Sequence, residues 1–220
     1  MPSDTANIKQ FFKPQKKNKM DTKNKLNRAK FYTTLRQVPL AKLKPLTQAQ
    51  VDGINHILDE WDASPELTDI RWLAYMLATV YHETDGTMCA INEYGKGKGR
   101  AYGRKVKHSG IAYSIPNQLY YGRGLVQLTW YENYELMGRL LKVDLLNNPD
   151  MALNPIIAVK IMFEGMTKGS SSFGDFTGKC LEMYFNKTSN DPVSARRIIN
   201  GTDKASLIAG HYHDFLRCLK

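Results

Sequence analysis

The stretch of sequence that decides the fold is residues 69–86, which read DIRWLAYMLATVYHETDG. Its apolar residues recur at three- and four-residue spacings, as on the buried face of a helix: Leu73, Met76 and Val80. A start signal at Thr68 or Asp69 precedes the pattern and Asp85-Gly86 supplies a stop. The spacing therefore predicts a helix that ends in a carboxylate, Glu83.

Outward from this helix, the same spacing recurs on both sides. Thr47 and Gln50 have the spacing of a capping box ahead of a predicted helix over 48–62, and a further helix is predicted over 131–141. Asn154-Pro155 is a helix start, and Asp191-Pro192 repeats that signal. Asp203 is expected to cap a final helix with four apolar residues in period: Ile208, Tyr212, Phe215 and Leu219.

Glycines mark a different kind of segment in the middle of the chain. Residues 86–124 contain eight of the 16 glycines and little helical period, which indicates loops or a short hairpin. The predicted fold class is therefore mainly α, with a small irregular or β-hairpin region.

Positive charge is concentrated at the N-terminus. Residues 1–30 hold nine basic and two acidic residues, a net +7 of the total +10. Such a segment cannot bury enough apolar surface to offset its chain entropy, so we expect a basic, flexible tail over 1–30 and one domain over 31–220. The tail is expected to attract a polyanion, such as an anionic envelope surface, although a solvated tail without a partner fits the same pattern.

Several classes of protein are excluded by what the sequence lacks. No apolar run has the length of a membrane span or of a signal peptide. The three cysteines have neither disulfide-framework nor zinc-ligand spacing. His82-Glu83-Thr84 lacks the second histidine of a metalloprotease helix, and no strand precedes the glycine-rich segment 95–100 as a phosphate loop requires. No metal, nucleotide or other cofactor is expected.

Catalytic chemistry is expected to start at Glu83. A carboxyl group at the end of an apolar stripe is held partly away from water, which favours the protonated form of a general acid. Glu93 lies ten residues further on, and the break at Asp85-Gly86 allows the chain to turn back. The two carboxyl groups could then stand about 6.5 to 9.5 Å apart, the separation in inverting glycosidases. A solvated helix-terminal glutamate is the alternative.

A second block, residues 120–134, reads YYGRGLVQLTWYENY. Apolar and polar residues alternate over 125–129, so an extended chain would place Gln127 and Thr129 on one face. An amide and a hydroxyl would then lie side by side, flanked by aromatic rings that stack on sugars. A short amphipathic strand with solvated polar residues fits the same pattern.

Together these motifs resemble glycoside hydrolase family 19, and more narrowly its chitinase-related phage endolysins and prophage lysozymes. The resemblance runs from about Leu46 to Leu219 and rests on five motifs in consistent order: His82-Glu83-Thr84, Glu93, the block from Tyr120 to Trp130, Asp144-Leu145 through Asp150, and Ile198-Ile199-Asn200-Gly201. It implies an α-rich, lysozyme-like fold and inverting hydrolysis of a β-1,4 bond next to an N-acetylated amino sugar.

The resemblance also implies roles for individual residues. Glu83 would be the general acid, Glu93 the general base, and Thr129 would hold the attacking water by its hydroxyl. Four residues are expected to contact sugar or to complete the network around the catalytic groups: Tyr121, Gln127, Asn133 and Asn200. Arg123 is expected to be a structural or electrostatic partner, and His82 and His108 to be hydrogen-bonded structural groups.

The chain also departs from the family pattern. It lacks the cysteines of secreted plant chitinases, and its C-terminal helix reads His211-Tyr212-His213 where an arginine is expected. The segment between the two glutamates is shorter than in plant chitinases, which favours peptidoglycan strands as the substrate.

The sequence thus predicts a monomeric peptidoglycan-degrading glycosidase, a lysis enzyme or a virion-associated wall hydrolase. It would be made in the host bacterial cytoplasm and act on the wall after release, or be carried in the virion. A chitinase acting on chitin oligomers is the alternative, and a non-enzymatic polyanion-binding virion protein is a further one.

Overall fold

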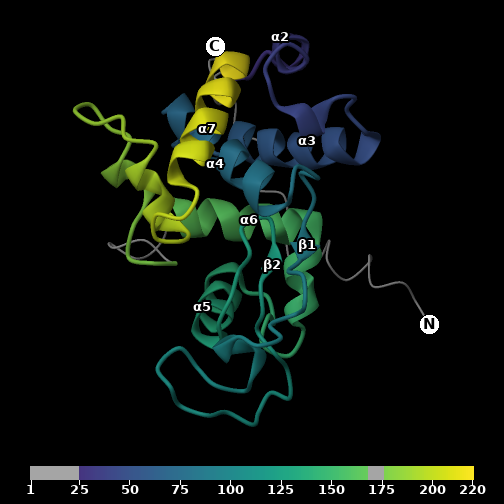
Figure 1. Ribbon diagram of the computed structural model, residues 1–220, viewed down its shortest axis with the longest axis vertical. Helices are drawn as coiled ribbons and strands as arrows, with labels where there is room; N and C mark the ends of the chain where they lie inside the picture. The colour runs from purple at the N-terminus through teal and green to yellow at the C-terminus, as the bar shows by residue number, and fades with distance from the viewer. Residues whose placement is uncertain (1–24, 168–175) are drawn as a thin grey trace.

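The computed structural model describes residues 25–167 and 176–220 (Figure 1). The α-helices of this part are α2 (Arg28–Leu35), α3 (Gln48–Asp62), α4 (Ile70–Glu83), α5 (Tyr131–Leu141), α6 (Pro155–Met166) and α7 (Ala205–Leu219). Short 3-10 helices lie between them: η2 (Ala41–Leu43), η3 (Ala101–Gly103), η4 (Pro149–Leu153), η5 (Leu181–Met183) and η6 (Ser194–Ile198). One antiparallel sheet pairs β1 (Ile91–Asn92) with β2 (Arg123–Gly124). The predicted class, mainly α with a small hairpin region, is confirmed.

Most of the predicted basic tail, residues 1–24, lies outside the described residues. The predicted boundary at residue 30 falls inside α2, whose Phe31 and Leu35 are buried in the core. Helix α2 packs against α7, so this helix belongs to the folded body.

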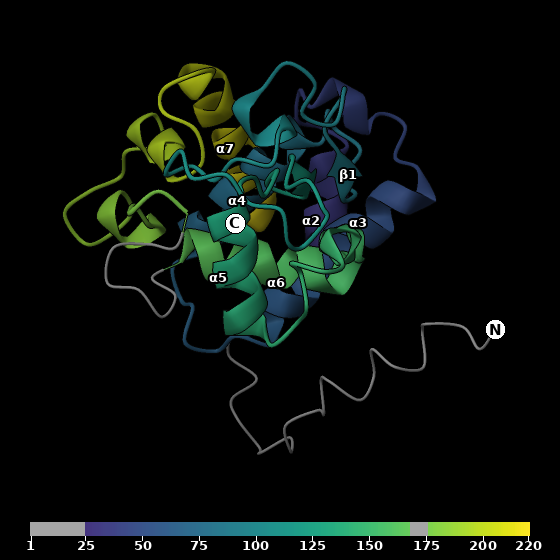
Figure 2. The same cartoon turned by 90° about the horizontal axis from the view of Figure 1, so that it is seen from below.

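Helix α4 forms the centre of the core. Every residue from Leu73 to Tyr81 is buried, and α4 packs along α7. Figure 1 shows α2, α3, α4 and α7 in the upper part of the molecule, α6 across its middle, and α5 with the sheet below. Figure 2 shows α5 and α6 side by side, in agreement with their contacts. After α4 the chain runs into β1, so the sheet lies below the helices of the upper part in Figure 1.

The helix starts follow from the capping residues. The Thr47 hydroxyl accepts from the Gln50 N–H and the Gln50 side chain accepts from the Thr47 N–H, so the capping box is formed. Asp69 caps α4, and Asn154 caps α6 with Pro155 at its first position. These predicted starts are confirmed.

Two predictions near the C-terminus are wrong. Asp191 begins no α-helix: its side chain accepts from the Ser194 N–H at 2.9 Å and starts the 3-10 helix η6. Asp203 does not cap the last helix, because α7 begins at Ala205, directly after the left-handed Lys204 (φ 56°), and no side-chain cap is formed there. The Asp203 carbonyl oxygen accepts from Arg196 Nε at 3.0 Å.

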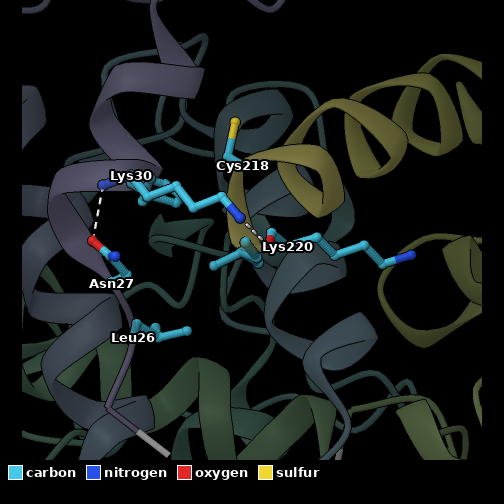
Figure 3. A pocket seen from close by; sticks show the side chains of 7 residues that line it. Leu26, Asn27, Lys30, Cys218 and Lys220 are labelled. Carbon is cyan, nitrogen blue, oxygen red and sulfur yellow. Dashed lines mark hydrogen bonds between the residues drawn. The ribbon is translucent and has the colours of Figure 1, made fainter.

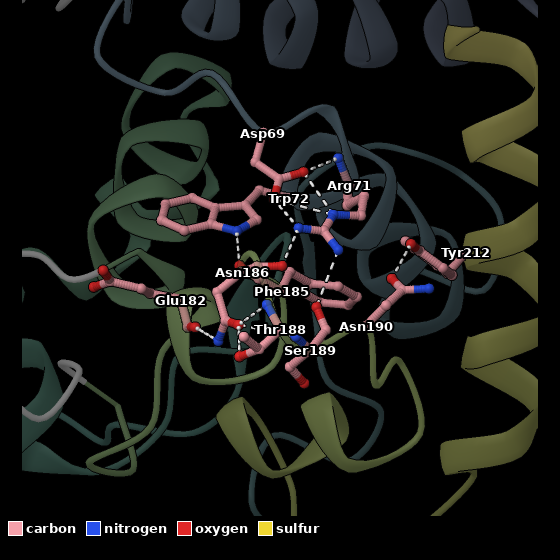
Figure 4. Close-up of polar contacts among 10 residues, drawn as sticks. All are labelled: Asp69, Arg71, Trp72, Glu182, Phe185, Asn186, Thr188, Ser189, Asn190 and Tyr212. Atoms are coloured by element: carbon pink, nitrogen blue, oxygen red, sulfur yellow. Dashed lines mark hydrogen bonds and ion pairs between the residues drawn. The ribbon is translucent and has the colours of Figure 1, made fainter.

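The N-terminal end of α4 is bound to the segment that leads into η6 (Figure 4). The Arg71 guanidinium donates to the carbonyl oxygens of Asn186 (2.8 Å) and Ser189 (3.0 Å). Trp72 Nε1 donates to the Phe185 carbonyl oxygen at 3.0 Å. These bonds fix η6 relative to α4.

A cavity of about 190 Å³ lies between α2 and the end of α7 (Figure 3), lined by Leu26, Asn27, Lys30, Phe31, Cys218, Leu219 and Lys220.

Across the described residues, no helix combines the length and the apolar character needed to cross a bilayer.

Thr79 gives a test of the packing around α4. It is 1% exposed and its hydroxyl has no hydrogen-bond partner among the described residues. Thr79→Val keeps the shape and removes an unpaired buried hydroxyl, so the free energy of unfolding should rise by about 1 kcal/mol in urea titrations. Thr79→Ser, the control, keeps the hydroxyl and should lower it by about 1 kcal/mol through the lost methyl group. Destabilisation by Thr79→Val would contradict this packing.

Two half-buried histidines at the α4–α7 contact predict how stability depends on pH. Burial lowers the pKa of His82 and His211 from 6.5, and His82 lowers that of His211 further. Around His82, the charges of Glu83 and Asp203 oppose this shift while those of Arg196 and Lys204 add to it.

Because both folded-state pKa values lie below the unfolded ones, the unfolded state binds more protons as the pH falls. The free energy of unfolding should therefore decrease as the pH drops below 6.5. Urea titrations across this range should show a shallower decrease for His211→Gln than for the wild type or for His213→Gln, a change at an exposed position on the same helix. Equal slopes for all three proteins would refute the assignment.

Candidate active site

Glu83 is the last residue of α4, and the residues after it turn the chain sharply. The Thr84 hydroxyl donates to the Val80 carbonyl oxygen at 2.7 Å and accepts from the Met88 N–H at 3.0 Å. Asp85 (φ 52°) and Gly86 (φ 79°) adopt left-handed conformations, as the predicted stop requires. The His-Glu-Thr motif thus ends the helix and leaves the Glu83 side chain at its tip.

The turn after Glu83 is also held from α3. Gln50 Nε2 donates to the Gly86 carbonyl oxygen at 2.8 Å, and a Cβ atom on Gly53 would lie 2.1 Å from the Met88 carbonyl oxygen. The absence of a side chain at Gly53 therefore lets the chain beyond Glu83 pack directly on α3.

The Glu83 carboxylate forms a buried ion pair with Arg196 of η6. The Arg196 Nη1 to Glu83 Oε1 distance is 2.5 Å, and the two side chains are 2% and 14% exposed. Arg196 Nε donates to the Asp203 carbonyl oxygen, which fixes the guanidinium between η6 and α7. Positions 211–213 of α7, where the family resemblance leads us to expect an arginine, hold two histidines and a tyrosine, and the cation that pairs with Glu83 comes from η6.

Glu93 lies on the sheet side of the molecule, directly after β1. Its N–H donates to the Gly122 carbonyl oxygen at 2.8 Å, and its carboxylate accepts from the Tyr102 hydroxyl at 3.1 Å. A Cβ atom on Gly122 would lie 2.8 Å from Gln127 Oε1 and 3.0 Å from Glu93 Oε2. Glycine at this position therefore allows Glu93 and Gln127 to lie against the same stretch of backbone.

The predicted extended strand over 125–129 is wrong. Arg123 and Leu128 pair through two backbone hydrogen bonds, which close a tight turn with Gln127 in a left-handed conformation (φ 55°). Gln127 Nε2 donates to the Ile91 carbonyl oxygen at 3.3 Å, whereas the Thr129 hydroxyl donates to the Gln127 carbonyl oxygen at 2.7 Å. The turn overrides the alternation of the sequence.

Backbone strain is concentrated around Thr129. Gln127 and Trp130 both have positive φ angles, 55° and 77°, although neither is glycine. Each such conformation costs on the order of 1–3 kcal/mol and is typical of functional sites. Asn133 Nδ2 donates to the Thr129 carbonyl oxygen at 2.9 Å, so the first turn of α5 holds this segment in place.

Tyr121 and Arg123 form a buried structural pair. The Arg123 guanidinium lies 3.6 Å from the centre of the Tyr121 ring, and Arg123 Nε donates to Asp150 at 2.7 Å. Tyr121 is 9% exposed, so any contact of its ring with a sugar is limited to an edge. Arg123 has the structural role that the sequence predicts.

The predicted residues thus fall into two groups. Glu83 belongs to the helical part, together with Asn200, an exposed residue whose N–H donates to the Arg196 carbonyl oxygen at 3.0 Å. The other group lies around the sheet and the start of α5: Glu93, Tyr121, Gln127, Thr129 and Asn133. The separation of the two carboxyl groups stays a prediction.

Sequence reasoning missed Arg196 and Tyr102. Arg196 follows the buried Ala195 and precedes the buried Ile198, an apolar setting that could have indicated an inward-facing cation. No sequence signal distinguishes Tyr102, which packs edge-on against Trp130 at 5.5 Å. The exposed His108 ring lies edge-on to the same tryptophan at 4.9 Å, and its backbone N–H donates to Glu132 at 3.1 Å; a hydrogen-bonded role of its side chain stays a prediction.

The chemistry available at these positions is that of carboxyl groups. Within residues 25–167 and 176–220, no cluster of three histidine, cysteine or acidic side chains could hold a metal ion.

The cavity of Figure 3 belongs to another region of the molecule. It lies at the C-terminal end of α7, whereas the Arg196–Glu83 pair lies near the N-terminal end, and the helix between them is about 20 Å long.

Comparison with known proteins gives matches to one family. The sequence profile of glycoside hydrolase family 19, described as chitinase class I, matches residues 62–177, more than half of the chain. Endochitinase 1 of Theobroma cacao is 38% identical over 106 residues, 44% of this chain and 33% of that protein. Basic endochitinase of Vitis vinifera is 34% identical over 102 residues, 42% and 32% of the two chains. The chain spans about a third of the length of these curated relatives.

Solved structures show the same fold. A bacterial family 19 chitinase superposes with a TM-score of 0.57 at 23% identity, over 89% of this chain and 95% of that chain. Chitinase C from Streptomyces griseus HUT6037 gives 0.52 at 23% identity, over 86% and 88%. The α-rich, lysozyme-like arrangement that the resemblance implies is confirmed, and by the match over residues 62–177 the chain belongs to glycoside hydrolase family 19, the chitinase class I family.

Proposed function

We propose that this protein hydrolyses the β-1,4 bond next to an N-acetylated amino sugar with inversion, with Glu83 as the general acid and Glu93 as the general base. The observation that carries the proposal is the buried Arg196–Glu83 pair at the tip of α4. Membership of family 19 supports the reaction class, and the similar proteins named as endochitinases support a polymer of N-acetylglucosamine.

In this mechanism Glu83 reacts in its protonated form: it donates that proton to the leaving glycosidic oxygen while Glu93 takes a proton from the attacking water, and the ion pair with Arg196 is the state that Glu83 reaches after the transfer. The proton transfer leaves Glu83 as a carboxylate, and Arg196 stabilises the charge that forms there. On the sheet side, the Thr129 hydroxyl would hold the water in line with the anomeric carbon. Tyr102 donates to the Glu93 carboxylate and so orients it.

Two polymers carry the required linkage. Chitin is a chain of N-acetylglucosamine, and peptidoglycan alternates this sugar with N-acetylmuramic acid. The comparisons favour chitin, because the relatives bear chitinase names. The short segment between Glu83 and Glu93 favours peptidoglycan, and with it a role in lysis or in virion entry.

Replacing the proposed acid tests the reaction directly. Glu83→Gln cannot donate a proton, so kcat on chitin oligomers and on soluble peptidoglycan fragments should fall by about 10² to 10⁴. Release of reducing sugar, with the new end group assigned by mass spectrometry, measures the loss. Glu66→Gln, a change at an exposed glutamate ahead of α4, is the control and should keep wild-type activity. Equal activity of Glu83→Gln and the wild type on every substrate would refute the mechanism.

The base and the water-holding hydroxyl require a separate test. Glu93→Gln should lose activity by a similar factor, and Thr129→Val should lose about 100-fold because the water is no longer positioned. Thr129→Ser retains a hydroxyl and should retain most of kcat. Comparable losses in Thr129→Ser and Thr129→Val would assign Thr129 to packing instead of to the water.

A further inference from the structure

Beside the candidate base lies a run of uncompensated positive charge. The basic loop, residues 95–107, carries six basic side chains: Lys96, Lys98, Arg100, Arg104, Lys105 and Lys107. No acidic residue occurs between Glu93 and Glu132. This charge is separate from the N-terminal tail and belongs to the folded body.

The basic loop is folded back on Glu93. At its start, the Lys96 N–H donates to the Glu93 carbonyl oxygen at 3.3 Å, and further along, the Tyr102 hydroxyl donates to the Glu93 carboxylate. Gly103, the residue after Tyr102, packs on Gly97: a Cβ atom on Gly103 would lie 1.8 Å from the Gly97 carbonyl oxygen. The two glycines therefore close the loop through backbone contact, and its charges stay next to the candidate active site.

Four of the six cations are available to a ligand. Lys96, Lys98, Arg100 and Arg104 are exposed, and none forms an ion pair with an acidic side chain of the described residues. The other two are engaged within the fold: Lys105 donates to Asn117, and Lys107 lies over the Tyr131 ring at 4.2 Å. By contrast, the more buried arginines Arg71, Arg123 and Arg196 each pair with a carboxylate.

A neutral polymer offers this loop no opposite charge. Every sugar of chitin is uncharged, so clustered cations beside the site would only repel one another. The peptidoglycan strand has the same β-1,4 backbone and carries a lactyl group on every second sugar, with acidic peptides attached. When such a strand is bound at Glu93, its carboxylates would lie near the loop, where surface cations raise the local concentration of an anionic substrate.

We propose that the basic loop is a carboxylate-binding subsite that selects acidic glycan strands over chitin, with Lys98 and Arg100 as its main contacts. This proposal rests on the proposed glycosidase function and assigns its substrate class. Nucleic acid is a less fitting occupant, because the loop is tied to Glu93, where a sugar linkage is cut, instead of standing on a separate face.

The test compares a loop variant of reduced positive charge with a control variant. Lys98→Gln/Arg100→Gln removes two loop charges, and Lys187→Gln/Arg217→Gln removes two charges from other exposed positions. Three soluble substrates are used: peptidoglycan fragments, the same fragments with their carboxyl groups amidated, and chitin oligomers. At low salt the loop variant should lose about tenfold in kcat/KM on the acidic fragments and little on the two neutral substrates, and the control should match the wild type on all three.

Salt should abolish the difference between the wild type and the loop variant on acidic fragments. An equal loss on neutral and acidic substrates, or no loss on acidic ones, would overturn the proposal. A second result would also overturn it: duplex DNA inhibits the wild type but not the loop variant, while the two proteins have the same kcat/KM on acidic fragments.

Calorimetric binding of acidic and amidated fragments to the wild type keeps this proposal separate from the catalytic one. Tighter binding of acidic fragments that disappears in the loop variant supports the subsite even if no substrate is hydrolysed. If acidic fragments bind in this way but no substrate is hydrolysed, the proposed glycosidase function is wrong and the subsite proposal stands. Equal affinity for acidic and amidated fragments would defeat the subsite.

Discussion

The position of the Glu83 carboxylate depends on its buried ion pair with Arg196. Their side chains are separated by 113 positions in the sequence and are brought together by three elements, α4, η6 and the start of α7. A buried pair adds little net stability over apolar packing, but loss of one partner leaves a charge stranded and costs about 3–5 kcal/mol. The bonds of Arg71 and Trp72 to residues 185–189 hold the other end of α4, so η6 and the tip of α4 keep one relative geometry.

The two sides of the candidate site are built by different means. The helical side is fixed by packing, since α4 is buried along most of its length and its terminal turn rests on Gly53 of α3. The sheet side has only two paired residues in each strand, and it relies on glycines, on strained residues at 127 and 130, and on the aromatic contact of Tyr102 with Trp130. In the proposed mechanism the helical side carries the acid and the sheet side carries the base, and the two act on one bond from opposite sides.

Sequence patterns predict those parts of the structure that depend on local interactions. The helices α3, α4 and α6 follow from apolar spacing and capping residues, α5 follows from apolar spacing, and Asp85-Gly86 marks the end of α4 as expected. The turn at Gln127 is not predictable from alternation, because pairing between Arg123 and Leu128 imposes it. One residue separates the start of α7 from the predicted cap, because Lys204 adopts a left-handed conformation between Asp203 and the first residue of the helix. Glu83 and Glu93 could be proposed from sequence, whereas the pairing of Arg196 with Glu83 required the fold.

The most direct measurement of the central claim is a crystal structure of the Glu83→Gln variant with a bound tetrasaccharide of N-acetylglucosamine. The account predicts that the amide at position 83 lies within hydrogen-bonding distance of one glycosidic oxygen. A water held by Glu93 and Thr129 should lie on the opposite face of the neighbouring anomeric carbon. A sugar chain bound with both carboxyl positions on the same face of the bond, or bound away from residues 83 and 93, would contradict it.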